Sequence, residues 1–306
     1  MTMAMAMTER ESTRTAAMSR TVAHQRHAAR ALAAFGILAV VSGCKKTYSL
    51  DSSSVIDSYK RCAPCMLVGH MKNASGIAFN PDSRSLFIIN DSPTLINETD
   101  CEGKVLRTIR LDHAFDLEGI AYLGADRFAI VDEGTSTIHF LTLTAGTESV
   151  DLSTTDKIRL DIPRNNNGLE GIAYDRAEGC FYVIKERRPK RILRIDMGSE
   201  EVSTPWDLGK LNVGDVSDIF FDQQTEHLMI LSHEGKCIVE CGRHGREYGR
   251  LSLAKGQAGM ETGFRKPEGL SLDPQTRRLF VCGEGNDLCI YGPREQQATQ
   301  PRLARR

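Results

Sequence analysis

The chain has almost no net charge, and this absence excludes partners that are bound mainly through charge. Its 306 residues include 39 lysines and arginines against 40 aspartates and glutamates, a formal charge of −1. Proteins that bind nucleic acid or anionic membrane surfaces carry an excess of basic residues. We therefore expect no nucleic acid among the partners of this protein.

Sequence motifs of common enzyme classes are also missing. The chain contains no G-x-S-x-G nucleophile elbow, no H-E-x-x-H zinc motif and no phosphate-binding P-loop. Its eight histidines share no spacing typical of metal ligands, so we interpret them as surface or hydrogen-bonded residues. The absence of an evident nucleophile favours a binding protein over an enzyme.

Amphipathic helices are missing after residue 44, and a repeated pattern takes their place. Each of five copies has a short apolar segment, a polar turn, a second apolar segment and an acid at its end. Turn sequences such as N-P-D-S and D-P-Q-T predict that each copy is a β-hairpin. The copies are spaced 43, 52, 47 and 51 residues apart at one anchor position, which is held by Gly76, Gly119, Gly171, Asp218 and Gly269.

The repeat predicts an all-β, five-bladed β-propeller over residues 67–292. Strands are also expected between the hairpins, at 104–111, 137–143, 157–162, 191–196, 237–242 and 288–292. Four short strands in every 40–50 residues are typical of propeller blades, whereas a solenoid, the structural alternative, holds a tighter period. The last copy lacks its fourth strand, which we expect the N-terminal segment 65–70 to supply, closing the ring.

The first 50 residues have the composition of an export signal. Arg20, Arg26 and Arg30 precede an uncharged apolar run at 31–43, which is too short to span a bilayer. The run ends in V-S-G-C, which looks like a bacterial lipobox whose cysteine, Cys44, carries the lipid. An ordinary signal peptide followed by an incidental cysteine is the alternative.

These features predict the organisation of the whole chain. We expect a lipoprotein signal peptide at 1–43 with translation starting at Met18, an anchor or linker at 44–66, and a disordered tail at 293–306 after the propeller. The expected location is the bacterial cell envelope, on the outer membrane and facing the periplasm, because Lys45 is similar to the outer-membrane sorting residue. We expect a monomer that contacts the membrane through the lipid on Cys44.

Eight cysteines remain when Cys44 is set aside, and an exported chain can oxidise them. C-A-P-C at 62–65 has no βαβ pattern around it, so a thioredoxin-like motif is not expected. A local disulfide or spare thiols explain it better. The spacing does not define the pairings.

The position before each anchor holds an unusual set of residues for a strand. In a propeller the first strands of all blades surround one axis, so these five side chains should converge. Three of them are carboxylates, which repel one another at short range, and no copy has a lysine or arginine at this position. The five residues are Ser75, Glu118, Glu170, Ser217 and Glu268.

A hard divalent cation would neutralise this ring. An all-oxygen set of ligands suits Ca²⁺, whereas Mg²⁺ demands a stricter octahedron and zinc prefers cysteine and histidine. Hydrogen bonds to strand ends, with water in the channel, are the alternative explanation. A second set of acids follows the second strands and is expected mostly to face the turns at one rim: Asp91, Asp132, Glu133, Glu186, Glu234 and Glu284.

The anchors, quoted as SGIAF, DLEGIAY, NGLEGIAY, DVSDIFF and KPEGLSLDP, resemble those of the SdiA-regulated proteins of bacteria. The resemblance covers residues 67–292 and implies a five-bladed propeller, distantly related to NHL-repeat propellers, with a bound calcium ion. The Ser/Glu/Glu/Ser/Glu order also resembles the central calcium site of the calcium-activated nucleotidases, or apyrases. Esterase-like phytase propellers use a similar L-E-G-I-A motif.

Two functions follow from these observations. The first is a calcium-stabilised binding module that presents one face to an envelope protein or a glycan. The alternative is a calcium-dependent hydrolase of phosphoric esters or anhydrides, in which the metal would polarise a phosphoryl oxygen. Four basic residues could bind the anion, although a solvated hairpin loop explains 185–191 as well; they are Lys185, Arg187, Arg188 and Lys266.

Overall fold

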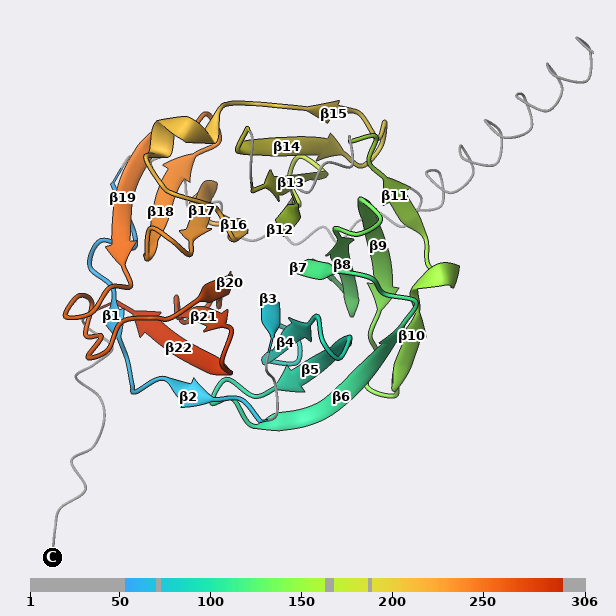
Figure 1. Cartoon of the computed structure of the whole chain (residues 1–306), viewed down its shortest axis with the longest axis horizontal. Coiled ribbons are helices and arrows are strands. Elements are labelled where there is room, and N and C mark those ends of the chain that lie inside the picture. Colours follow the sequence, from blue (N-terminus) through green and yellow to red (C-terminus); the bar gives the residue numbers. More distant parts are fainter. Residues whose placement is uncertain (1–52, 70–72, 163–167, 187–188, 294–306) are drawn as a thin grey trace, which may run out of the picture. The chain divides into compact units, whose positions relative to one another are not determined.

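The computed structural model describes residues 53–69, 73–162, 168–186 and 189–293. The predicted signal peptide, Met18, Cys44, Arg187 and Arg188 lie outside the described residues, as does the tail after residue 293. Within the described part, five sheets surround one axis, and β3, β7, β12, β16 and β20 lie nearest to it (Figure 1). This arrangement confirms the five-bladed β-propeller. No helix in these ranges is long and apolar enough to cross a membrane.

The blades follow one another along the chain, each beginning with its innermost strand. The first contains β3 (Ala74–Asn80), β4 (Ser85–Asn90), β5 (Leu95–Thr99) and β6 (Val105–Asp112), with β10 (Ser149–Asp151) parallel to β6. The second contains β7 (Leu117–Gly124), β8 (Arg127–Asp132), β9 (Thr137–Thr142) and β11 (Lys157–Arg159). The third contains β12 (Leu169–Asp175), β13 (Cys180–Lys185), β14 (Arg191–Asp196) and β15 (Val202–Ser203). The fourth contains β16 (Asp218–Asp222), β17 (His227–Ser232), β18 (Cys237–Gly242) and β19 (Glu247–Ser252).

The fifth blade is completed from the other end of the chain. It contains β20 (Pro267–Leu272), β21 (Leu279–Gly283) and β22 (Asp287–Gly292), and β22 pairs with both β1 (Lys60–Arg61) and β2 (Met66–Leu67). The predicted closure by an N-terminal strand is confirmed. The closing segment also extends upstream into the range expected to be a linker, because Ile56 and Tyr59 are buried in the core beside β1.

A disulfide fixes the same junction. Cys65 is bonded to Cys289 of β22, across 224 positions of the sequence. The C-A-P-C segment thus forms no local disulfide: Cys62 keeps its thiol and packs at the edge of the core. Because the bond closes almost the whole propeller into a loop, the chain-entropy account gives a stabilisation of about 5 kcal/mol.

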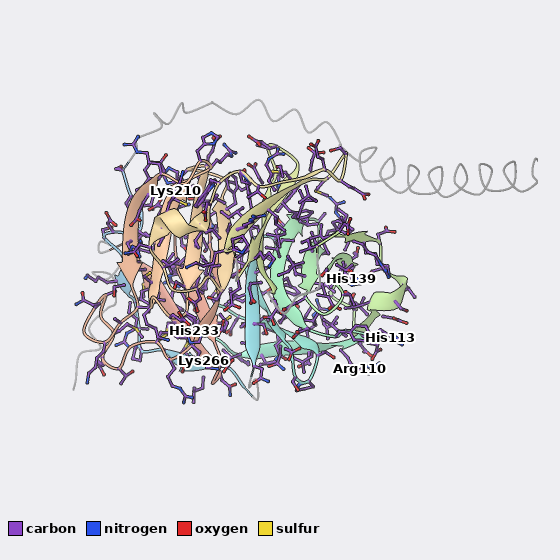
Figure 2. All side chains as sticks on the ribbon, turned by 45° about the horizontal axis from the view of Figure 1, so that its top comes forward. Arg110, His113, His139, Lys210, His233 and Lys266 are labelled. Atoms are coloured by element: carbon purple, nitrogen blue, oxygen red, sulfur yellow. A yellow bond between two sulfur atoms is a disulfide. The ribbon has the colours of Figure 1, made fainter. Side chains whose placement is uncertain are left out.

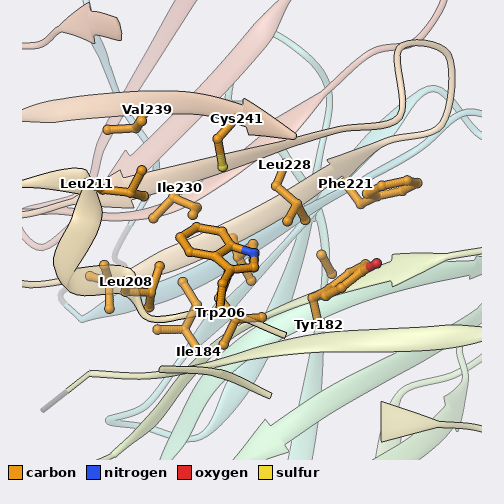
Figure 3. Close-up of a cluster of buried hydrophobic side chains, with 14 of the residues drawn as sticks. Tyr182, Ile184, Trp206, Leu208, Leu211, Phe221, Leu228, Ile230, Val239 and Cys241 are labelled. Carbon is orange, nitrogen blue, oxygen red and sulfur yellow. The ribbon is translucent and has the colours of Figure 1, made fainter. Parts of the chain in front are cut away.

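The hydrophobic core consists of separate layers between neighbouring blades. Figure 3 shows the layer between the third and fourth blades, where Trp206 packs among Ile184, Leu208, Leu228 and Ile230. The second strand of every blade is buried along its whole length or nearly so, because both of its faces meet a neighbouring blade. This explains why β4, β13, β17 and β21 read as continuous apolar runs and not as alternating ones.

The five inner strands come closest to one another at the anchor residues, which we call the waist. A Cβ atom on Gly119 would lie 2.8 Å from the backbone oxygen of Glu170, and one on Gly269 would lie 2.9 Å from the Cα of Gly76. Gly76 approaches Gly119 in the same way, and Gly171 approaches Asp218. Real Cβ atoms do not tolerate such distances, so glycine is required by the close approach of backbones.

The fourth blade has an aspartate at the waist, and its side chain makes the contact instead. The Asp218 carboxylate accepts hydrogen bonds from the backbone N–H of Ile219 (2.8 Å) and from that of Leu270 in the fifth blade (2.7 Å). Burial raises its pKa well above the usual value, against the effect of these hydrogen bonds. Asp218 thus links the innermost strands of two blades where glycines do so elsewhere.

Ion pairs join neighbouring blades at the opposite ends of the inner strands. Arg277 of the fifth blade binds Asp222 of the fourth (Nη2 to Oδ2, 2.5 Å), and Asp222 is almost completely buried. Its carboxylate also accepts from the backbone N–H of Gln224, which makes an Asx-type turn. Burial alone raises the pKa of Asp222, but the hydrogen bonds and charge of Arg277 outweigh burial and lower it below the usual range.

We expect Gly119→Ala to destabilise the propeller by about 1–3 kcal/mol or more, because the new methyl group meets immobile backbone atoms. Urea unfolding followed by circular dichroism measures the loss. Gly146→Ala is the matched control, since a Cβ there meets nothing within 4 Å and should leave the unfolding midpoint unchanged. Equal effects of the two substitutions would contradict the close approach at the waist.

We expect Arg277→Ala to cost about 3–5 kcal/mol at neutral pH, because it leaves a buried carboxylate without its partner. The folded-state pKa of Asp222 lies below its unfolded value, so the stabilisation is present above about pH 4 and is lost as the pH falls further. The difference in unfolding free energy between wild type and Arg277→Ala should therefore shrink in acid. Arg110→Ala, which removes an exposed pair with Asp112, should leave stability unchanged at both pH values.

Candidate metal centre

The residue before each anchor stands at an irregularity of the strand. The register of the innermost pair of strands shifts between Ala74 and Gly76, and shifts in the same way at the anchors of the second, third and fifth blades. At such a β-bulge two residues face one on the partner strand, which bends the backbone and redirects a side chain. The bulge residues are Ser75, Glu118, Glu170 and Glu268.

The three glutamates of the predicted ring lie close enough to influence one another. Glu118 interacts electrostatically with Glu170, and Glu170 interacts with Glu268. Further acids surround them, so that nine carboxylates interact on this side of the waist, which we call the acidic mouth. They are Asp91, Asp116, Glu118, Glu133, Glu170, Glu186, Asp215, Glu268 and Glu284.

Burial and mutual repulsion raise the pKa values of the three glutamates. Desolvation is the largest cause for each. The pKa values of Glu118 and Glu170 are raised far above the usual range, with repulsion from their carboxylate neighbours adding to desolvation. The pKa of Glu268 rises less, to about 7, because Lys266 opposes the effect of its neighbours Glu284 and Asp215.

The two serines of the predicted ring have hydrogen-bond partners in neighbouring backbone. The Ser75 hydroxyl donates to the carbonyl oxygen of Asn73 (3.4 Å), and the Ser217 hydroxyl donates to that of Pro267 (3.0 Å). Ser217 is buried, and Ser75 is half-buried. Each hydroxyl oxygen keeps lone pairs that could still accept or coordinate.

Two basic residues, His233 and Lys266, lie beside Glu268 and Glu284 at the acidic mouth. Nδ1 of His233 is 3.4 Å from Oε1 of Glu268, and Lys266 forms an ion pair with Glu284. Figure 2 shows His233 and Lys266 close to each other, and the charge of Lys266 contributes to the lowered pKa of His233, after burial. Near the glutamates of the second and third blades, Lys185 is the basic residue whose charge reaches Glu133.

Asp116, Glu118 and Glu133 form the tightest acidic group at this mouth. Each offers an oxygen atom within 4.8 Å of the others, which is a spacing that a single cation can bridge. Asp116 and Glu118 are also hydrogen-bonded to each other. Four acids of the second predicted set lie at this mouth: Asp91, Glu133, Glu186 and Glu284. Among them, Glu133 interacts with both Glu118 and Glu170.

A second group with metal-like spacing lies elsewhere and has a different environment. Asp175, Glu178 and Cys180 also place their ligand atoms within 4.8 Å of one another. Arginines already neutralise its acids, since Arg243 binds Asp175 (2.6 Å) and Arg194 binds Glu178 (3.1 Å). The group at the acidic mouth is the better candidate for a cation.

Asp116 and Asp215 also belong to the acidic mouth, although neither was predicted from the sequence. Both stand two residues before a predicted ring position, in the motifs D-L-E-G and D-V-S-D. Asp215 is buried and accepts hydrogen bonds from the hydroxyl of Ser232 (2.7 Å) and the backbone N–H of Glu234 (2.8 Å). The recurring aspartate was a visible signal, and Lys266 occupies the same place in the fifth blade.

The chain is similar to one protein family in sequence and to several solved structures in fold. A family model described as SdiA-regulated matches residues 53–289. A protein of unknown function from Bacteroides thetaiotaomicron VPI-5482 superposes with a TM-score of 0.50 at 13% identity, over 73% of this chain and 56% of that chain. This chain thus spans little more than half of that protein, and the likeness shows the fold alone.

Two further solved structures are similar at lower scores. A luciferin-regenerating enzyme has a TM-score of 0.48 and 12% identity, over 76% of this chain and 94% of that chain. A chain of the nidogen/laminin complex has a TM-score of 0.45 and 16% identity, over 74% of this chain and 82% of that chain.

We expect Glu118→Gln to raise the stability of the protein in a chelating buffer by about 1 kcal/mol or more, because it removes one buried charge from a repelling group. The folded-state pKa values of Glu118 and Glu170 exceed their unfolded values, so wild-type stability in chelator should fall as the pH rises from about 5 to about 8. That slope should be smaller in the variant. Glu102→Gln, at an exposed acid, is the control, and a loss of stability in Glu118→Gln would contradict the repulsion.

Proposed function

The chain belongs to the SdiA-regulated family, and we propose that it is a calcium-binding β-propeller that acts as a binding module at the bacterial cell envelope. The observation that carries the metal part of this proposal is the excess of carboxylates at the acidic mouth. Asp116, Glu118 and Glu133 are within reach of one cation, and Glu170 is the next acid around the axis.

The donor set fits a hard divalent cation. The acids of the second and third blades offer carboxylate oxygens only, and the hydroxyls of Ser75 and Ser217 are the remaining members of the predicted ring. Oxygen ligands of this kind suit Ca²⁺, which accepts six to eight of them in flexible geometry. A bound cation would offset the repulsion that raises the pKa values of Glu118 and Glu170.

A binding role fits the chemistry of this mouth better than hydrolysis does. Lys266, one of the residues expected to bind an anion, already has Glu284 as its partner, and Lys185 is largely buried at the end of β13. The proposed role of the cation is to hold the bulged strand ends of the second and third blades together. The ligand of the module would be a protein or a glycan of the envelope.

The proposed location rests on the N-terminal sequence. The apolar run at 31–43 and the lipobox-like V-S-G-C support cleavage before Cys44 and attachment of a lipid to its thiol. The propeller, as a monomer, would then stand on the outer membrane and face the periplasm.

We expect Ca²⁺ to bind the purified propeller and to raise its melting temperature by about 5–10 °C at 100 times the dissociation constant. Glu118→Gln should weaken the binding measured by calorimetry at least tenfold, because one ligand oxygen loses its charge. Glu178→Gln is the matched control, since that acid belongs to the group already neutralised by arginine. Binding that is absent in the wild type, or unchanged in Glu118→Gln, would contradict the metal site.

A phosphate-release assay separates the binding module from the hydrolase. Nucleotides and phytate are incubated with the protein in the presence of Ca²⁺, with Glu170→Gln as the comparison. No release is the expected result. Release by the wild type that disappears in Glu170→Gln would replace the binding module with a calcium-dependent phosphohydrolase.

We expect Cys44→Ser to release the protein from the membrane fraction of expressing bacteria, because the variant has no thiol for the lipid. Fractionation with immunodetection measures the change, and metabolic labelling with a fatty acid should mark only the wild type. Cys62→Ser, at the next cysteine along the chain, is the control and should remain in the membrane fraction. Equal labelling of Cys44→Ser and wild type would exclude Cys44 as the anchor.

A further inference from the structure

The opposite side of the waist holds a cavity with very different chemistry. Its volume is about 310 Å³, and the innermost strands of all five blades line it. The lining begins with the residues that follow the anchors, such as Ile77 and Ile172. The acidic mouth is formed by residues that precede the anchors and by acids that follow the second strands. We call this space the apolar mouth.

Small side chains create the space. Two positions after the anchor, the first, second and third blades carry Ala78, Ala121 and Ala173, and the fifth carries Ser271. The fourth blade departs from this pattern with Phe220, whose half-buried ring borders the cavity. At this position, two residues after the anchor, only the fourth blade has a large side chain, and the small side chains of the other four blades leave the cavity open.

Two tyrosines supply rigid walls. Tyr122 and Tyr174 both line the cavity, and each ring is held from behind by a phenylalanine of its own blade at a centroid distance of 5.3 Å. An engineered apolar cavity of about 150 Å³ binds benzene, so this volume accommodates a body of about two rings. Cavities of about 300 Å³ or more with aromatic walls and few polar groups are typical of small-molecule sites.

Two charged residues line the cavity, and only one of them is paired within the described ranges. Asp222 is bound by Arg277, and the hydroxyl of Tyr122 donates to the carboxylate of Asp82. Arg176 lines the mouth between the two tyrosines and lies beside Gly124, and its guanidinium forms no ion pair within the described ranges. Its backbone N–H is held by Gln223 (3.2 Å), which fixes the loop that carries it.

We propose that the apolar mouth binds a hydrophobic monocarboxylate with a body of about two fused rings. The ring system lies between Tyr122 and Tyr174 over the small residues Ala121 and Ala173. The carboxylate stays at the rim, where the Arg176 guanidinium donates to it. A bidentate pair with arginine fixes the orientation of the ligand and distinguishes it from a neutral molecule of the same shape.

The test is calorimetry with naphthalene-2-carboxylate, and with naphthalene-2-carboxamide as the neutral molecule of matched shape. Both are titrated in chelating buffer, so that the outcome is independent of the metal at the acidic mouth. We expect a dissociation constant of about 100 μM or tighter for the carboxylate, and binding about tenfold weaker for the carboxamide. Equal affinity for both molecules, or no binding of the carboxylate, overturns the proposal.

Variants locate the ligand. Arg176→Gln should weaken carboxylate binding to the level of the carboxamide. Arg176→Lys should restore only part of it, because an ammonium group keeps the charge but cannot form the bidentate pair. Both substitutions change an exposed side chain and leave the core intact. Ala121→Phe introduces the residue that the fourth blade already has at this level, and should abolish binding of both molecules in protein whose circular dichroism is unchanged. Unaltered carboxylate affinity in Arg176→Gln overturns the site even if Ala121→Phe does not fold.

Discussion

The close approach of five backbone segments at the waist is the constraint on which the rest of this propeller depends. Strands that nearly touch at Gly76, Gly119, Gly171 and Gly269 leave no room for side chains, and Asp218 completes the ring with its own hydrogen bonds. The axis is thereby divided into two mouths. Residues before the anchor share one chemical environment and residues after it share another, because the waist separates two short stretches of the same strand.

The acidic mouth shows how a repeated irregularity can gather function-bearing groups. In four of the five blades, a β-bulge at the residue before the anchor redirects one side chain without changing the hairpin behind it. Blades that carry glutamate there add to a concentration of negative charge, and blades that carry serine do not. Acids dominate around Glu118. Glu268 has two basic neighbours, which are Lys266, two residues before it, and His233, which follows the second strand of the fourth blade.

Much of this architecture could be predicted from the sequence, because each blade of a propeller corresponds to one copy of a sequence repeat. The five anchors gave the number of blades, and the strand at 104–111, like the other inter-hairpin strands, was found from its apolar and β-branched residues. The disulfide partner of Cys65 could not be predicted from the sequence. Pairing depends on which strands meet where the ring closes, and not on the spacing of the cysteines along the chain. The apolar mouth was missed for a similar reason: Ala121 and Ala173 are unremarkable singly, and the space that they leave exists only when five blades are assembled. Asp116 and Asp215 required alignment of the copies to one another, two residues upstream of the predicted ring.

The closure of the fifth blade has a consequence for the order in which the molecule is completed. β1 and β2 are the first strands to be synthesised, but their partner β22 is the last strand of the propeller. The two N-terminal strands therefore cannot pair until synthesis of the propeller is complete. Until then the fifth sheet has an open edge, and Cys65 has no partner. Oxidation of Cys65 with Cys289 can therefore happen only after the strands of all five blades have been synthesised, and the bond distinguishes a full-length propeller from any shorter chain.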